Sequence, residues 1–149
     1  MRAATIAACA LGCPAALGAS PLDFDFNPGG NAAGHPVYDD KQGFGFEPGG
    51  TQRFSVRVPE GSYAVTFRFA DSRKRSKVSV LAEQRRLMFE DVPVAKGTER
   101  TVVVNVRVPE LAALPANATG GTRVALKPRE IGSRNWDDKL TLEIRGDAA

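Results

Sequence analysis

The feature that most constrains the fold is an alternation of apolar and polar residues that recurs along most of the chain after Ser20. Successive side chains of a β-strand point to opposite faces, so this alternation predicts strands with one buried face and one face toward water. Shorter strands are predicted over 22–26, 43–47, 77–83 and 86–92. The longer sets of apolar residues that share a face are Phe54, Val56 and Val58; Tyr63, Val65, Phe67 and Phe69; Val102, Val104, Val106 and Val108; Val124 and Leu126; and Leu140, Leu142 and Ile144.

Turn residues separate these segments. Pro-Gly-Gly at 28–30 and 48–50, and Pro-Glu-Gly at 59–61, supply the fixed and the permissive backbone angles at which strands reverse. No segment keeps a helical period, and we expect at most one helical turn, at 111–114. About nine strands separated by turns predict an all-β domain, either a β-sandwich or a jelly roll. A chain of 149 residues has room for one such domain, which we place at 20–149.

Residues 1–19 have the pattern of an export signal. Arg2 supplies a positive charge, residues 3–17 are apolar or small and uncharged, and small residues around Gly18 offer a cleavage site. We therefore expect a secreted or periplasmic protein without a transmembrane segment. Both cysteines, Cys9 and Cys13, lie in this segment, so the mature domain would have neither a disulfide nor a thiol. A lipoprotein anchored through an acylated Cys13 is the alternative.

The chain shows no constellation of catalytic residues. Nucleophilic serine catalysis requires a histidine as the base, and the one histidine, His35, lies in a Gly-Pro loop with no Gly-x-Ser-x-Gly motif elsewhere. No His or Cys set has zinc-ligand spacing, and there is no phosphate-binding loop. We therefore expect no enzymatic activity from these residues. A net charge of +3, from 20 Lys+Arg and 17 Asp+Glu, is too small to indicate nucleic acid binding.

Aromatic and basic residues in loops are the candidates for ligand binding. The single tryptophan, Trp136, lies in a polar loop, where it acts either as a sugar-binding platform or as a plug at the end of the core. The basic run 73–77 is either a solvated hairpin tip or a patch for an anionic polymer, because guanidinium groups bind carboxylates in a bidentate way. The candidate residues are Trp136, Tyr38, Arg73, Arg75, Arg85 and Arg129.

Paired carboxylates suggest a calcium site. Asp23 and Asp25 lie on the first predicted strand of the domain, and Asp137 and Asp138 precede the last one. Terminal strands are often neighbours in a β-sandwich, so these oxygens could gather around a Ca²⁺ ion. The alternative is that the same carboxylates are solvated or form ion pairs.

Two groups of segments resemble known carbohydrate-related domains. LDFDFNPGG and YDDKQGFGFEPGG resemble the opening of galactose-binding-like jelly rolls, which include carbohydrate-binding modules. FSVRVPEGSYAVTF, AEQRRLMFEDV, VNVRVPE, LKPRE and NWDDKLTLEIRG resemble the N-terminal domain of bacterial rhamnogalacturonan acetylesterases, which are SGNH (GDSL-type) hydrolases acting on pectin. The similarity extends from residue 22 to residue 146.

The resemblance implies a galactose-binding-like fold and an accessory role. In that family the Gly-Asp-Ser and Asp-x-x-His motifs lie in a following α/β domain, so no catalytic residue carries over to this chain. We expect a monomeric, non-catalytic carbohydrate-binding or accessory domain whose partner is an acidic plant polysaccharide or an esterase catalytic domain. The alternatives are a truncated esterase and a structural packing domain that binds no sugar.

Overall fold

A computed structural model describes residues 3–8, 22–24, 37–49, 53–69, 77–93, 95, 97–109 and 124–146. These residues form β-strands and irregular segments, and none of them lies in a helix long and apolar enough to cross a membrane. The strands are β1 (Ala3–Ala8), β2 (Leu22–Phe24), β3 (Phe44–Phe46), β4 (Arg53–Arg57), β5 (Gly61–Arg68), β6 (Lys77–Ala82), β7 (Arg86–Pro93), β8 (Glu99–Val106) and β9 (Lys139–Gly146).

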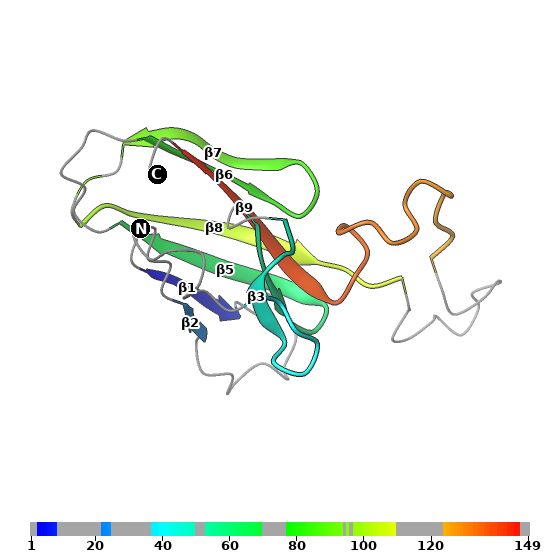
Figure 1. Cartoon of the computed structure of the whole chain (residues 1–149). Helices are drawn as coiled ribbons and strands as arrows, with labels where there is room; N and C mark the ends of the chain where they lie inside the picture. Colours follow the sequence, from blue (N-terminus) through cyan, green and yellow to red (C-terminus); the bar gives the residue numbers. More distant parts are fainter. Residues whose placement is uncertain are drawn as a thin grey trace.

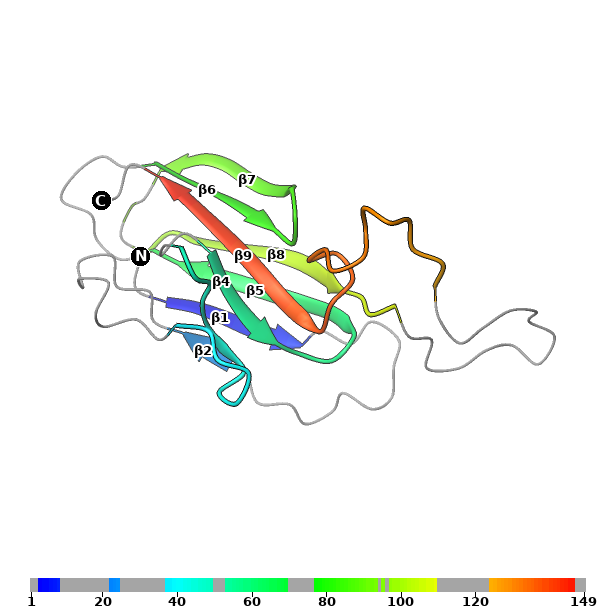
Figure 2. The same cartoon turned by 45° about the vertical axis from the view of Figure 1, so that its right-hand side comes forward.

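The strands form two antiparallel sheets in a sandwich-like arrangement (Figure 1). One sheet has the order β2-β1-β5-β8, and the other has the order β3-β4-β9-β6-β7. The all-β class expected from the alternation is therefore confirmed. Figure 2 shows that β9 crosses obliquely in front of β5 and β8, as expected when two twisted sheets are stacked.

The core lies between the two sheets and is built from the alternating residues. Val65 and Phe67 of β5 are fully buried, as are Leu140 and Leu142 of β9. The ring of Phe89, on β7, meets the Phe67 ring edge-on at a centroid distance of 5.4 Å, a favoured arrangement for aromatic pairs. Burial of these side chains is the main stabilising term, because no disulfide links the described residues.

Two features of the fold differ from the sequence expectations. No strand forms at Val124 and Leu126, where the backbone is irregular and the Val124 N–H donates to the carbonyl of Pro109 at 2.7 Å. The second difference is β1, which lies inside the segment interpreted as an export signal. It pairs with β5 from Ala3↔Arg68 to Ala8↔Tyr63 and lies between β5 and β2. Cleavage of this segment, and acylation of Cys13, remain predictions.

The strand registers bring several loops to one end of the fold. Arg57 at the end of β4 is opposite Lys139 at the start of β9, and β6 ends beside the same part of β9. We call the described residues 37–43, 83–86 and 124–138 the loop end. It lies on the right in Figure 1, where the segment leading to β9 extends beyond the sheets. Phe69 and Lys77 lie at the opposite end.

Candidate functional site

The loop end is shaped by a series of short turns before β9. The N–H of Glu130 donates to the carbonyl of Lys127 at 2.8 Å, and the N–H of Ser133 donates to the carbonyl of Glu130 at 3.1 Å. Gly132 has a φ of 73°, a conformation that glycine adopts without steric cost. Further along, the N–H of Trp136 donates to the carbonyl of Ser133 at 3.0 Å. Hydrogen-bonded turns therefore define the backbone that carries Trp136.

Side-chain and backbone contacts join this segment to the turn between β6 and β7. The Asn135 amide donates to the Gln84 side-chain oxygen at 3.1 Å. One residue earlier, the Glu83 N–H donates to the carbonyl of Thr141 at 2.8 Å, which extends the pairing of β6 with β9. Two exposed amides from distant parts of the sequence thus meet at the loop end, and one of them, Asn135, directly precedes Trp136 in the sequence.

Trp136 itself is half-buried, so its indole is neither fully inside the core nor fully in water. Arg85 and Arg129 are exposed at the same end, so the fold brings these three predicted ligand residues to one end of the domain. Arg73 and Arg75 lie outside the described residues. The nearest described residues on either side of them in the sequence, Phe69 and Lys77, lie at the end opposite Trp136.

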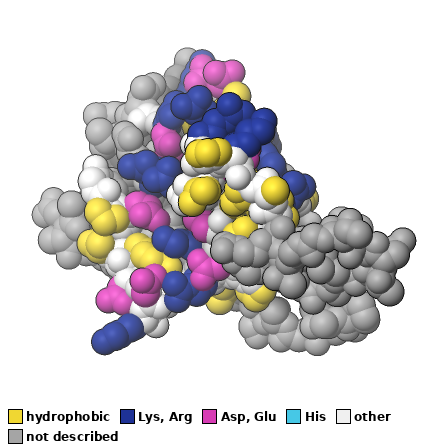
Figure 3. Space-filling model, turned by 90° about the vertical axis from the view of Figure 1, so that its right-hand side faces the viewer, with side chains coloured by type: hydrophobic (Ala, Val, Ile, Leu, Met, Phe, Trp, Pro, Cys, Tyr) yellow, Lys and Arg dark blue, Asp and Glu magenta, His cyan; other side chains and the backbone are white. Residues whose placement is uncertain are grey.

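Cations at the loop end have no ion-pair partner among the described residues. Elsewhere, the charges of β5, β6 and β9 are paired, as in Arg68–Glu99 at 2.9 Å and Arg145–Glu143 at 2.7 Å. Figure 3 looks onto the loop end and shows Lys and Arg side chains gathered over its upper part, next to apolar side chains. The cations of the loop end without a described ion pair are Lys41, Arg85, Arg86, Lys127, Arg129 and Arg134.

Tyr38 is held in place by other side chains of this end. The Lys139 ammonium lies 4.3 Å from the centre of the Tyr38 ring, a cation–π contact that occupies one face of the ring. The Tyr38 hydroxyl is buried and has no hydrogen-bond partner within the part of the chain that the structure describes. Burial raises the pKa of this hydroxyl, Arg57 opposes that change, and Asp40 adds to it. Tyr38 therefore contributes to packing, and Lys139 occupies one face of its ring.

The carboxylates expected to bind calcium have separate protein partners. The Asp138 carboxylate accepts from the Arg57 guanidinium at 2.9 Å, whereas the Asp137 carboxylate accepts from the Lys139 N–H at 3.1 Å. Asp25 and the side chain of Asp23 lie outside the described residues. Among the residues that are described, no three His, Cys, Asp or Glu side chains gather in a way that could hold a metal ion. The calcium site remains a prediction.

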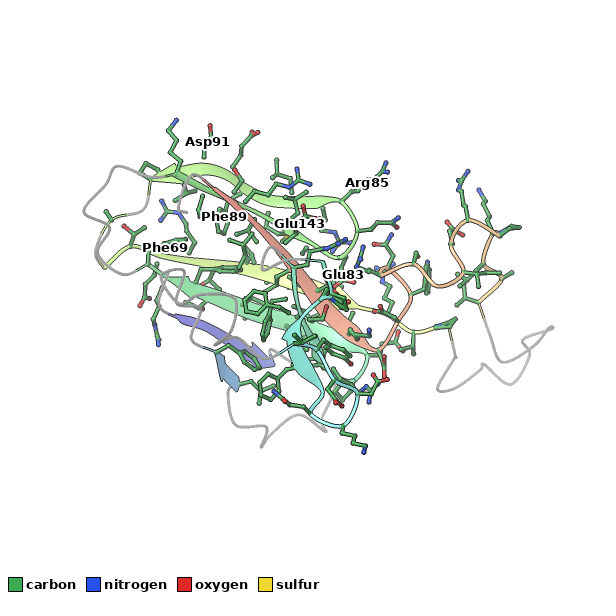
Figure 4. All side chains as sticks on the ribbon, viewed as in Figure 1. Phe69, Glu83, Arg85, Phe89, Asp91 and Glu143 are labelled. Carbon is green, nitrogen blue, oxygen red and sulfur yellow. The ribbon has the colours of Figure 1, made fainter. Side chains whose placement is uncertain are left out.

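A buried carboxylic acid, Glu83, is the part of the loop end that sequence reasoning missed. Glu83 is 6% exposed, and its φ of 57° lies in the left-handed region that few residues other than glycine adopt. One carboxyl oxygen accepts from the Thr141 N–H at 3.4 Å. Figure 4 shows Glu83 close to β9, below the outward-pointing Arg85.

Burial sets the protonation state of Glu83. It raises the pKa of Glu83 from its ordinary value of 4.5 to about 8; Asp137 adds to the rise, while the Thr141 hydrogen bond, Arg86 and Arg134 oppose it. Burial also raises the pKa of Asp137. Glu83 is therefore mostly protonated at neutral pH and adds no full negative charge beside the cations. The one sequence signal for it was an acidic residue at the end of a predicted strand.

A polar network covers the outer face of the sheet next to Glu83. The Ser55 hydroxyl lies 2.8 Å from the Thr141 hydroxyl and donates to Glu47 at 2.7 Å. The Lys139 ammonium lies 3.8 Å from the same Glu47 oxygen. Ser55 and Thr141 are almost completely buried although they face away from the core. This network fixes the start of β9, from which the Trp136 segment extends.

Comparisons with protein-family models, with curated proteins and with solved structures each found no match.

Proposed function

We propose that this protein is a non-catalytic carbohydrate-binding accessory domain whose ligand is an acidic polysaccharide of the pectin type. The proposal includes a more specific fold type within the all-β class, a galactose-binding-like jelly roll of about nine strands. The two antiparallel sheets and the resemblance to the N-terminal domains of rhamnogalacturonan acetylesterases support it. Export through the N-terminal segment would bring the domain to such polysaccharides.

The observation that carries the proposal is the composition of the loop end. It places a half-buried tryptophan, a pair of exposed amides and cations without a described ion pair at one end of the fold. The described acidic groups of this end are either protonated or have partners within the domain. Burial keeps Glu83 mostly protonated, and the N–H of Lys127 donates to Glu130 at 2.9 Å.

Each of these groups matches a part of an acidic sugar. A guanidinium binds a uronate carboxylate with two parallel hydrogen bonds, and an indole face packs against the apolar face of a pyranose ring. The Gln84 and Asn135 amides have both donors and acceptors for ring hydroxyl groups. Because the cations are exposed, we expect the binding to be weak and to decrease as salt is added.

Affinity electrophoresis of the full chain tests the proposal. Gels contain polygalacturonate, rhamnogalacturonan or neutral galactan and are run at low and moderate salt. We expect retardation in the acidic gels, a loss of it at higher salt, and a loss of it in the Arg85→Ala/Arg129→Ala variant. The control is Arg68→Ala/Arg100→Ala, which removes the same charge from exposed residues at the opposite end.

The outcomes separate the competing interpretations. Unchanged mobility of the wild-type chain in every gel would rule out the carbohydrate proposal for these ligands. An equal loss of retardation in Arg85→Ala/Arg129→Ala and in Arg68→Ala/Arg100→Ala would show that net charge, rather than the loop end, governs binding. A loss of retardation that occurs only in an Arg73→Ala/Arg75→Ala variant would place the site on the basic run instead.

A further inference from the structure

Two adjoining segments of the loop end each carry a large apolar side chain that is exposed to water. Leu87, just after the turn between β6 and β7, is 51% exposed, and Ile131, in the turns before β9, is 70% exposed. Ile131 is the most exposed large hydrophobic residue that the structure describes. The hydrogen bond from Asn135 to Gln84 joins the two segments. Two such side chains on joined segments differ from the single, scattered apolar residues usual on a protein surface.

The sheet register keeps Leu87 out of the core. Leu87 is directly opposite Leu81 of β6, and Leu81 is opposite Glu143 of β9. The next residues of those two strands, Ala82 and Leu142, are fully buried between the sheets. Successive residues of a strand point to opposite faces, so the row that contains Leu87 lies on the outer face of the five-stranded sheet. Its exposure is therefore built into the fold.

Exposed cations lie beside both apolar side chains. Two of them directly precede Leu87, two more lie within four residues before Ile131, and none has an ion pair in the part of the chain that the structure describes. The four cations are Arg85, Arg86, Lys127 and Arg129. The nearby acids oppose them little, because burial raises the pKa of Glu83 to about 8 and the half-buried Glu130 accepts from a backbone N–H at 2.9 Å.

We propose that residues 84–87 and 127–131 form a docking surface for a lipid bilayer with anionic headgroups. Leu87 and Ile131 enter the headgroup region, and the four cations bind lipid phosphates, which guanidinium groups hold with two hydrogen bonds. Figure 3 shows basic and apolar side chains next to each other on this end, and Figure 4 shows Arg85 pointing away from the sheets. Binding of this kind places the domain on a membrane and needs no spanning segment.

The exposed aliphatic side chains favour a bilayer over a soluble anion. A soluble anionic polymer satisfies the cations but offers no apolar layer to Leu87 and Ile131, whereas a bilayer offers anionic groups and an apolar layer within a few ångströms. Trp136, half-buried on the same segment as Ile131, is of a residue type enriched at membrane interfaces. The lipid and the polysaccharide would therefore share the cations and differ in their need for the two aliphatic side chains.

The third segment of the loop end, 37–43, does not belong to the docking surface. Val37 is 62% exposed and Lys41 has no described ion pair, but Asp39 and Asp40 lie between them in the sequence and are exposed. Two carboxylates would be repelled by an anionic surface. This difference predicts which part of the loop end faces the lipid, and it makes Val37 a suitable control position.

Co-sedimentation of the full chain with vesicles tests the proposal. The vesicles contain phosphatidylcholine alone, or phosphatidylcholine with a minority of phosphatidylglycerol, and binding is measured at low and moderate salt. We expect binding to the anionic vesicles only, and weaker binding as salt is added. Each cation near such a surface strengthens binding roughly fivefold, so the Arg85→Ala/Arg129→Ala variant should bind roughly 25-fold more weakly.

The aliphatic side chains are tested separately from the charge. The Leu87→Ser/Ile131→Ser variant keeps every cation and should bind anionic vesicles about tenfold more weakly or worse, because it loses the apolar contact. The matched control, Val37→Ser/Val103→Ser, removes two exposed aliphatic side chains from other places and should bind like the wild type. No binding by the wild type, equal binding to neutral vesicles, or an unchanged affinity of Leu87→Ser/Ile131→Ser would overturn the proposal.

Two further readouts separate the lipid from the polysaccharide and locate the contact. Leu87→Ser/Ile131→Ser should still be retarded in the acidic polysaccharide gels, and a parallel loss of retardation and vesicle binding would overturn the assignment of these side chains to a lipid surface. In a Cys9→Ser/Cys13→Ser background, a polarity-sensitive fluorophore on Ile131→Cys should shift to the blue on anionic vesicles. The same fluorophore on Val37→Cys should not, and equal shifts at both positions would contradict the proposed orientation.

Discussion

Replacing Glu83 with glutamine should change how the stability of the protein depends on pH. A carboxylic acid with a raised pKa in the folded state holds a proton that the unfolded chain loses at lower pH. Its contribution is therefore fully present below the unfolded pKa of 4.5 and is lost as pH rises toward the folded pKa of about 8. Wild-type protein should become less stable between these two values, and the Glu83→Gln variant should lose this component.

The magnitude follows from the shift. Each unit of pKa difference is worth about 1.4 kcal/mol, so the Glu83 contribution between about pH 5 and about pH 9 is roughly 4 kcal/mol. The Glu83→Gln substitution also lowers the free energy of unfolding by itself, because the glutamine amide must find hydrogen-bond partners in a buried place. That cost does not vary with pH and cancels when the stability difference between variant and wild type is compared at the two pH values.

Urea unfolding measured at a series of pH values tests this expectation. The free energy of unfolding of the wild type minus that of Glu83→Gln should fall by several kcal/mol from about pH 5 to about pH 9. Glu90→Gln, at an exposed carboxylate on β7, is the matched control and should show little change. Parallel pH profiles for the wild type and Glu83→Gln would refute the argument that burial keeps Glu83 protonated.

Other expectations concern stability and can be measured by urea unfolding at neutral pH. Ser55→Ala should lower the stability by about 1–3 kcal/mol, since it leaves the buried Thr141 hydroxyl without the Ser55 hydroxyl as its partner and removes a donor from Glu47; an unchanged stability would show that the network adds nothing. Gly45→Ala should cost about 2 kcal/mol or more, because a Cβ there would lie 2.5 Å from the Tyr38 nitrogen. Gly49→Ala, where φ is also positive but the space is open, should cost less, and equal losses would contradict the steric explanation.

The core could be predicted from the sequence because it depends on a local pattern. Val65 and Phe67 alternate with polar neighbours in a long strand, and that alternation alone indicates which face is buried. The same argument failed at Val124 and Leu126, where only two residues alternate and Pro128 follows shortly after. It gave no sign of β1, because the small residues of that segment carry neither an alternation nor a high β-propensity.

The site could be predicted only in part, because it depends on contacts between distant segments. Trp136 and Arg85 were found from residue type, but their placement at one end requires the register of β6 against β9. The burial of Glu83 depends on its positive φ, which ends β6 after Ala82 and turns the chain. Nothing in the residue itself distinguishes it from the exposed acids of the same chain.

The most direct test of the proposed function is an NMR titration of the ¹⁵N-labelled chain with galacturonic acid oligomers. Trp136 gives the one indole N–H signal of the protein, and the Gln84 and Asn135 side-chain amides report on the same place. We expect these signals to shift together and saturably at low salt, with no shifts at the opposite end beside Phe69 and Lys77. A spectrum that does not change, or shifts confined to that opposite end, would contradict a binding site at the loop end.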